Sequence, residues 1–299
     1  PELKTMRPNK WARVVCRPAL QKDTNDMLEL TSHIWDGHDY VPEVWADWLA
    51  DPHGFLAVAE YEGRVVGISM LECFQPGEWY LAGLRVHPEM EGQGIATRLN
   101  DYMLDYWQRR HHRGVVRLAT HNPKVKHLCD RTGFHSIGEF TIFVAPSIPE
   151  SVETLQPLLL DQVDPAISLA EKSPVFEWHA RLYGHGWSWS DLHPKYIIAA
   201  VEKGCAWLWR DGLGVLVIGE DKEDDGVMPL IELVGCSQEH LTALLLDYRR
   251  LAARLGHQKA GWVASLHPEL QPYLLEAGFY RDWDIALSVY ELRAPEVVT

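Results

Sequence analysis

The segment from Leu84 to Ala96, LRVHPEMEGQGIA, constrains the fold more than any other part of this chain. A β-rich run that ends at Val86 enters a turn with two glycines spaced by one residue. An amphipathic helix then begins, because apolar residues recur there at helical spacing. Glycine lets the backbone approach an anion closely, and the N–H groups and dipole of a helix N-terminus favour negative charge. The segment therefore predicts a phosphate-binding loop between a strand and a helix.

Two well-known phosphate loops do not fit this segment. The dinucleotide fingerprint needs a third glycine that residues 93–97 lack, and no Gly-Lys-Ser/Thr of a P-loop follows. The segment instead resembles the cofactor loop of the GNAT acyl-CoA N-acyltransferase superfamily, written V-x-P-x-x-R/Q-G-x-G-x-G/A. Glu91 departs from that pattern, since the family commonly has Arg or Gln there. The residues that fit it are Val86, Pro88, Gly92, Gly94 and Ala96.

The chain around the loop has the order of elements that this resemblance implies. Phe55–Tyr61 and Val65–Phe74 are expected to form a hairpin, and Val115–Thr120 a buried strand. A helix is expected to end at Gly133, and the last strand of this half to run from Ser136 to Ala145. The expected fold class is therefore α/β (α+β), a GNAT fold with a mixed central sheet. The alternative is an ordinary glycine-containing turn in an unrelated fold.

The second half of the chain repeats this layout. A strand at Leu230–Val234 precedes an amphipathic helix, and Gly278-Phe279 repeats Gly133-Phe134. The two glycines are 278 − 133 = 145 residues apart, and the corresponding strand valines, Val234 and Val86, are 234 − 86 = 148 residues apart. The paired glycines are missing between residues 235 and 240. We therefore expect a catalytic GNAT domain at 1–146, a linker at 147–157 and a degenerate GNAT-like domain at 158–299. An unrelated α/β domain is the alternative for the second half.

Composition limits the partners and the compartment. The net charge of −14 argues against a nucleic acid or an anionic membrane as partner. No uninterrupted apolar run approaches the ~20 residues that a membrane span needs. The five cysteines are scattered without metal-ligand spacing, as is typical of reduced thiols in the cytoplasm. We expect a cytoplasmic protein without a metal site, and its oligomeric state stays open.

A second resemblance lies in the loop WDGHDYVP at residues 35–42, followed by WLADP at residues 48–52. Both are similar to the GNAT subfamily that includes histidine N-acetyltransferases, whose members carry a G-x-D-Y-x-P loop. The resemblance implies that this loop borders the acceptor pocket, where Asp39 could hold an ammonium group beside Trp35 and Tyr40. Arg85 is the nearest candidate cation for the carboxylate of an amino-acid acceptor, and Arg181 in the second half of the chain is another. Alternatively, Asp39 caps a helix and the two aromatic residues belong to the core.

The family resemblance also implies a cofactor and the residues that bind it. Acetyl-CoA would donate its acetyl group directly to an amine. The backbone of Leu84 and Val86 would pair with the pantetheine arm and polarise the thioester carbonyl. Asn122 matches a position that often contacts CoA in the family. The pyrophosphate would be held by the backbone N–H groups of Gly92, Gln93, Gly94, Ile95 and Ala96.

The reaction needs a base for the ammonium and an acid for the thiolate. Glu72 lies near the end of a largely apolar strand, where partial burial would raise its pKa toward the useful range. Glu78 is the second candidate base, although it lies beside a turn where we expect it to be solvated. His38 and His87 are further alternatives. Cys129 stands where the family often has a tyrosine as the acid, and an inert buried thiol is the other interpretation.

These observations predict an acetyl-CoA-dependent N-acetyltransferase whose partner is a small-molecule amine or amino acid, with histidine as one example. Two other classes remain open. One is a non-catalytic acyl-CoA sensor, which Glu91 and Cys129 would favour. The other is a protein lysine or N-terminal acetyltransferase, in which the aromatic second half docks a basic partner against the acidic surface.

Overall fold

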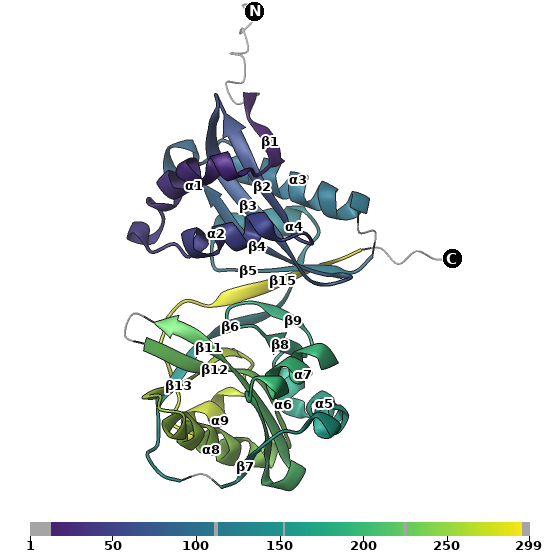
Figure 1. The fold of residues 1–299 in the computed structure, drawn as a ribbon, viewed down its shortest axis with the longest axis vertical. Helices are drawn as coiled ribbons and strands as arrows, with labels where there is room; N and C mark the ends of the chain where they lie inside the picture. Colours follow the sequence, from purple (N-terminus) through teal and green to yellow (C-terminus); the bar gives the residue numbers. More distant parts are fainter. Residues whose placement is uncertain (1–12, 111–112, 152, 224–225, 295–299) are drawn as a thin grey trace, which may run out of the picture. The chain divides into compact units, whose positions relative to one another are not determined.

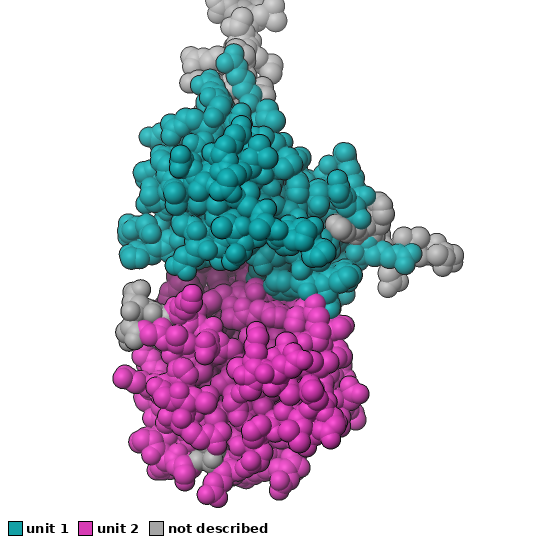
Figure 2. Space-filling view, in the orientation of Figure 1, with its two compact units in different colours: residues 1–118, 292–299 teal, residues 119–291 magenta. Residues whose placement is uncertain are grey.

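The computed structural model describes residues 13–110, 113–151, 153–223 and 226–294. The chain divides into two compact units, which Figure 2 shows in different colours. Unit 1 contains residues 1–118 and 292–299, and unit 2 contains residues 119–291. None of the described helices is long and apolar enough to cross a membrane.

Unit 1 is built on a sheet whose first four strands are antiparallel and whose fifth is parallel to the fourth. The antiparallel strands follow one another through short turns, whereas the parallel pair needs a crossover, which a helix supplies. This mixed sheet is the arrangement that the sequence predicts. Its strands, in spatial order, are β1 (Val15–Pro18), β2 (Phe55–Tyr61), β3 (Arg64–Gln75), β4 (Glu78–Val86) and β5 (Val115–Thr120).

Helices cover both faces of this sheet (Figure 1). Helices α1 (Thr24–Thr31) and α2 (Val41–Ala50) share one core cluster with Ile68 and Met70 of β3. The neighbouring residue Gly67 points to the other face, because a Cβ there would lie 3.0 Å from side chains of α3 (Ile95–Arg110). Successive residues of a strand face opposite sides, so β3 carries both contacts at once.

Unit 2 begins with α4 (Pro123–Arg131) and continues into β6 (His135–Pro146), which pairs antiparallel with β13 and β15. Its main sheet has the strand order β15-β6-β13-β12-β11-β10-β7. The remaining strands are β7 (Leu155–Pro157), β8 (Leu182–Gly184), β9 (Trp189–Asp191), β10 (Ala206–Trp209), β11 (Gly214–Glu223), β12 (Gly226–Cys236), β13 (Lys259–Ser265), β14 (Tyr280–Arg281) and β15 (Leu287–Arg293). The helices are α5 (Val163–Lys172), α6 (Pro174–Trp178), α7 (Pro194–Glu202), α8 (Leu241–Arg254) and α9 (Gln271–Glu276).

The same succession of elements occurs in both halves. In unit 1, β4 leads through a short 3₁₀ turn, Pro88–Met90, to α3 and then to the parallel strand β5. In unit 2, β12 leads through the 3₁₀ turn Gln238–His240 to α8 and then to β13, which is parallel to β12. One difference stands out, because residues 91–94 separate the turn from the helix only in the first copy. In the second copy α8 starts directly after the turn.

The strand predictions for β2 and β5 match the observed bounds, and the predicted hairpin of β2 and β3 is confirmed. The predicted division of the chain at residue 146 does not coincide with the boundary between the compact units, which falls after residue 118. The reason is the pairing of β6, whose residues form a long ladder with β13. The sequence analysis missed β15, which pairs with β6 from far along the chain.

Candidate active site

An extra residue in β4 shapes the centre of the unit 1 sheet. Ile68 pairs with Arg85 and Met70 pairs with Ala82, so two steps along β3 face three steps along β4. This is a β-bulge, which bends a strand and changes the face to which the following side chains point. Gly83 lies in the bulge with φ = 61°, and a Cβ there would come within 2.6 Å of the Trp48 ring. The bulge places Arg85 on the same face as Glu72.

Strands β4 and β5 stay paired only at their beginning. Their register runs from Glu78 opposite Val115 to Tyr80 opposite Arg117 and ends there, while β4 continues to Val86. On its other side β4 remains paired with β3 as far as Val86 opposite Gly67. The edge of β4 from residue 81 onward, which includes Leu84 and Val86, is therefore free of β5. An extended ligand could pair with such an edge.

The glycine loop follows this edge directly. Gly92 and Gly94 have φ angles of 72° and 77°, which L-residues rarely adopt, and no atom lies within 4 Å of a Cβ built on either. Ile95 starts α3, a helix of 16 residues, immediately after the loop. Open space, positive φ and a helix N-terminus together fit a phosphate group, as the sequence predicts. Arg98, in the first turn of α3, donates to the carbonyl of Val14.

Asp39 has a different partner from the ammonium group that we expected. Its two carboxylate oxygens accept hydrogen bonds from Nε and Nη2 of Arg85, at 2.8 and 3.0 Å, and Oδ1 also accepts from the Val41 N–H. The residue is buried, with 6% of its surface exposed. This guanidinium neutralises the charge of Asp39 and is in turn held in place by it. Asp39 stands one residue before Tyr40, the N-cap residue of α2, and its bond to the Val41 N–H joins it to the start of that helix.

The guanidinium of Arg85 lies within cation–π distance of two aromatic rings. Its central carbon is 4.6 Å from the centre of the Trp35 ring and 5.4 Å from that of Tyr40. Both rings are exposed, at 54% and 41%, so they belong to a surface rather than to the core. Trp35 and Asp36 also adopt positive φ angles, and such backbone strain is often found at functional sites.

Glu72 and Trp48 complete this group of residues. The indole Nε1 of Trp48 donates to Oε1 of Glu72 at 2.9 Å, and the Trp48 ring contacts Tyr40 edge-on. Burial raises the pKa of Glu72, the hydrogen bond from Trp48 lowers it, and Asp51 raises it further, with a net increase. A carboxyl group with a raised pKa is a better base near neutral pH, as we expected for Glu72.

Tyr40 lies within electrostatic range of both ends of this group. Although much of the Tyr40 ring is exposed, its hydroxyl end is enclosed, and this desolvation raises its pKa; the positive charge of Arg85 lowers the pKa and the negative charge of Glu72 raises it. We refer to Asp39, Arg85, Tyr40, Trp48 and Glu72 together as the acceptor cluster. The sequence placed four of these residues near the acceptor but gave no role to Trp48, whose bond to Glu72 depends on tertiary packing.

The expectation that Glu78 is solvated was wrong. Glu78 is buried, with 2% of its surface exposed, and it forms an ion pair with the equally buried Arg117 of β5. Gln75 also donates to its carboxylate at 2.8 Å. Because β4 and β5 are paired at this point, the carboxylate joins the two strands instead of facing the open edge. This ion pair makes Glu78 a poor base.

The remaining candidates lie in unit 2. Cys129 is 2% exposed, and burial raises the pKa of its thiol to about 12. That thiol is a weaker acid than an ordinary thiol, which disfavours the predicted role as proton donor. Asn122 caps α4, because its side chain accepts from the Lys124 N–H at 2.9 Å. Tyr290 of β15, which the sequence analysis missed, lies near Cys129 and Asp130, and burial raises its pKa.

Comparison with known proteins agrees with the geometry. Residues 22–134 match the model of the acetyltransferase (GNAT) family. A human protein named "Probable N-acetyltransferase 16" is 30% identical over 94 residues, which are 31% of this chain and 26% of that protein. A "Histidine N-acetyltransferase" from Oreochromis niloticus is 30% identical over 79 residues, which are 26% and 23% of the two chains. The chain thus matches about a quarter of the length of these relatives.

Solved structures extend the similarity to the whole chain. A GCN5-related N-acetyltransferase from Sphaerobacter thermophilus aligns with a TM-score of 0.65 over 94% of this chain and 96% of its own, at 12% identity. A tandem GNAT protein from the clavulanic acid biosynthesis pathway aligns with a TM-score of 0.58 over 94% and 99%, at 13% identity. The fold class predicted from the sequence, a mixed-sheet GNAT fold with a second GNAT-like region, is therefore confirmed.

Proposed function

We propose that this chain, whose residues 22–134 belong to the acetyltransferase (GNAT) family, transfers an acetyl group from acetyl-CoA to the amine of an amino acid. The observation that carries the proposal is the acceptor cluster, which places a basic carboxylate and an oriented guanidinium on one face of the sheet. Arg85 belongs to the part of β4 that β5 leaves unpaired, and Glu72 lies on the neighbouring strand β3, opposite Tyr80. The sequence alone predicts a small amine as acceptor. Because the Arg85 guanidinium can pair with a carboxylate, the proposal is restricted to amines that also carry a carboxylate.

The residues of unit 1 fit acetyl-CoA in two places. The loop glycines provide N–H groups at the start of α3 for the phosphates. The edge of β4 beyond Tyr80 provides backbone groups for an amide-bearing arm. When bound, acetyl-CoA supplies an acetyl group activated as a thioester. Glu91 is exposed, so its charge can stay in water away from the phosphates.

Glu72 is the base in this proposal. An amine of pKa ~10 is mostly protonated at neutral pH and cannot attack a carbonyl carbon until it loses a proton. The carboxylate of Glu72, directly or through a water molecule, takes that proton. A bond then forms between the amine nitrogen and the acetyl carbon, and the carbon–sulfur bond breaks, with its electron pair leaving on the CoA sulfur. Trp48 holds the carboxylate in position by donating to Oε1.

Arg85 is the group that binds the acceptor's carboxylate. Asp39 and the Leu84 carbonyl use three of its five N–H donors, which leaves two for a ligand. Along β3, Glu72 and the partner of Arg85, Ile68, are four residues apart, which corresponds to about 13 Å of strand. The side chains of Arg85 and Glu72, with a small amino acid between them, are together long enough to bridge this distance.

The proposal is tested with a panel of free amino acids and the corresponding decarboxylated amines, each incubated with acetyl-CoA. Thiol release gives the rate, and mass spectrometry of the product identifies the acetylated nitrogen. We expect α-amino acids, histidine among them, to be acetylated and their decarboxylated forms to react more slowly. Equal rates for both sets would remove Arg85 from the acceptor site. Faster acetylation of peptides or protein lysines would favour a protein acetyltransferase.

A second candidate function is a non-catalytic acyl-CoA sensor. The observation that favours it is Cys129, whose high pKa makes it a poor acid for the leaving thiolate. A sensor would bind acetyl-CoA without releasing thiol with any member of the panel. Two measurements together distinguish the candidates. Calorimetric titration shows whether acetyl-CoA binds, which both candidates predict, and thiol release with the panel shows turnover, which only the enzyme predicts.

A further inference from the structure

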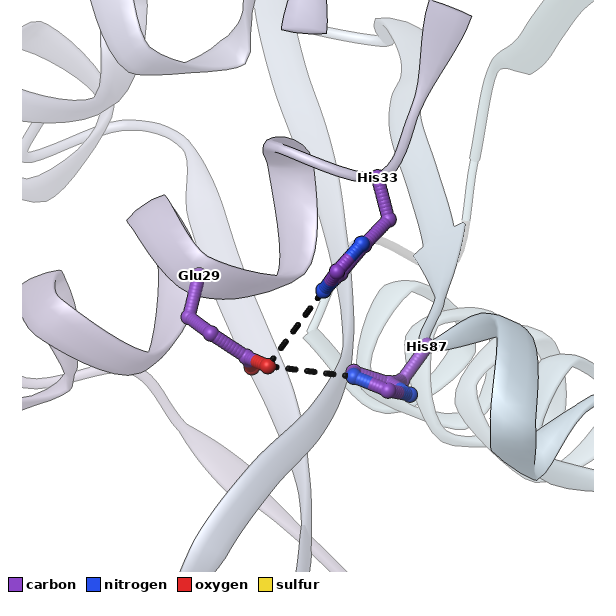
Figure 3. Close-up of side chains that lie close together, drawn as sticks. All are labelled: Glu29, His33 and His87. Atoms are coloured by element: carbon purple, nitrogen blue, oxygen red, sulfur yellow. Dashed lines mark hydrogen bonds and ion pairs between the residues drawn. The ribbon is translucent and has the colours of Figure 1, made fainter. Parts of the chain in front are cut away.

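We propose that Glu29, His33 and His87 form a binding site for a divalent transition-metal ion such as Zn²⁺. Glu29 belongs to the last turn of α1, His33 lies two residues beyond the end of that helix, and His87 follows β4 (Figure 3). One ligand atom from each lies within 4.8 Å of the others. We call these three residues the His–Glu cluster.

The distances within the cluster match those of a zinc polyhedron. Both imidazoles point Nε2 at the same atom, Oε1 of Glu29, from 3.4 Å for His33 and 3.3 Å for His87. These separations are longer than a normal N–H···O hydrogen bond, which is ~2.9–3.0 Å. With zinc–ligand bonds of about 2.0–2.2 Å, the edge of a coordination tetrahedron is about 3.3–3.6 Å. Two edges of such a tetrahedron are therefore already in place.

The surroundings leave each ligand atom able to coordinate. His87 is held by its packing, with 13% of its side chain exposed, whereas His33 is 48% exposed and free to close the remaining gap. Arg64 approaches the other carboxylate oxygen of Glu29, Oε2, at 3.5 Å. Oε1 thus remains available for a single bond to a metal.

Coordination would also change the turn that leads into the glycine loop. At present Nδ1 of His87 accepts from the Glu89 N–H at 3.3 Å. A metal on Nε2 requires the proton of the neutral imidazole to sit on Nδ1, so that contact would be lost. Two imidazoles and one carboxylate favour borderline ions such as Zn²⁺ over Mg²⁺ or Ca²⁺, and leave a fourth position for water.

The sequence predicts no metal site because its cysteines lack metal-ligand spacing and the residues of the His–Glu cluster are not all close together along the chain. The two ligands near α1 are four residues apart, but the third comes from a strand end much later in the chain. Only the packing of α1 beside the end of β4 brings His87 to them.

The site is tested on the tag-free full-length chain after metal removal, by equilibrium dialysis against Zn²⁺ with metal analysis and by Co²⁺ absorption. We expect one Zn²⁺ per chain and the visible bands of four-coordinate Co²⁺. His33→Ala and Glu29→Gln should each weaken zinc binding more than about 100-fold, which exceeds the 10–100-fold effect of losing an outer-shell partner. His53→Ala removes an exposed histidine outside the cluster and serves as the matched control.

Thermal unfolding gives a second readout, because a ligand that binds only the folded state stabilises it. Zinc should raise the Tm of the wild-type chain and of His53→Ala but not of His33→Ala. Equal zinc binding by wild type and both cluster variants would overturn the proposal. So would a loss of binding in His53→Ala as large as that in His33→Ala. Both measurements omit acetyl-CoA and therefore do not depend on the proposed reaction.

Discussion

Replacing Trp48 with Phe tests whether the indole of Trp48 tunes Glu72 as the base. The indole N–H donates to the Glu72 carboxylate at 2.9 Å and lowers a pKa that burial raises. A hydrogen bond to a charged group contributes about 1.5–3 kcal/mol and one to a neutral group about 0.5–1.5 kcal/mol. The difference, about 1–1.5 kcal/mol, corresponds to about one pKa unit at 1.36 kcal/mol per unit. Trp48→Phe should therefore raise the pKa of Glu72 by about one unit.

The assay is the pH dependence of kcat/KM for the best amino-acid acceptor. A base with a higher pKa is protonated over a wider range, so the acidic limb of the profile should move to higher pH by about one unit. Below the limb kcat/KM should fall about tenfold, and above it the two enzymes should agree. Protonation of the amine substrate also affects the acidic limb, but it does so equally in the wild type and in Trp48→Phe. The difference between the two profiles therefore reports on the enzyme alone.

Trp45→Phe is the matched control. Trp45 belongs to the same helix and is 2% exposed, but its Nε1 donates to Thr24 and not to Glu72. It loses the same kind of hydrogen bond without touching the proposed base, so its pH profile should match that of the wild type. An unshifted limb in Trp48→Phe, or an equal shift in both variants, would refute the assignment of Glu72.

Three further predictions follow from the geometry. Gly94→Glu should abolish acetyl-CoA binding in calorimetry while the protein stays folded, because it adds a negative charge to the phosphate loop. Gly63→Glu is the control: Gly63 has a similar φ of 82° and equally open surroundings, so the backbone strain is the same, and this variant should bind acetyl-CoA normally. The titration should give one acetyl-CoA per chain, since α8 of the second copy follows its turn without a glycine loop; a stoichiometry of two would contradict this. Glu72→Gln should raise the Tm at neutral pH and change it little in acid. The folded-state pKa of Glu72 is raised, so its contribution to stability is present at low pH and is lost as the pH rises through that pKa, whereas glutamine stays neutral throughout. An unchanged Tm at neutral pH would show that burying this carboxylate costs no stability.

Periodicity and turn residues were sufficient for most of the fold. The apolar runs of β2 and β5 and the glycine loop each depend on local sequence, and each was predicted with bounds close to those observed. Strand β15 was missed because its partner β6 lies far away along the chain, and local sequence does not encode such a pairing.

The candidate site was predicted less completely, because side-chain partners depend on tertiary contacts. Glu78 looked exposed beside its turn, and nothing nearby in the sequence indicated that Arg117 would neutralise it. Asp39 lies in the loop between α1 and α2, as the sequence predicts, but nothing nearby in the sequence indicated that its carboxylate would pair with Arg85. The bulge at Gly83 places Arg85 on the same face of the sheet as Glu72. Such a shift of one residue in strand pairing cannot be predicted from the periodicity of the sequence.

The central claim is that Arg85 binds the carboxylate of an amino-acid acceptor. The most direct measurement is kcat/KM for an amino acid and for its decarboxylated amine, such as histidine and histamine, in the wild type and in Arg85→Met. The wild type should prefer the amino acid by roughly 10–100-fold, the value of one hydrogen bond between charged groups at about 1.5–3 kcal/mol. In Arg85→Met that preference should disappear while acetyl-CoA affinity stays unchanged. A preference that survives the substitution would contradict the account.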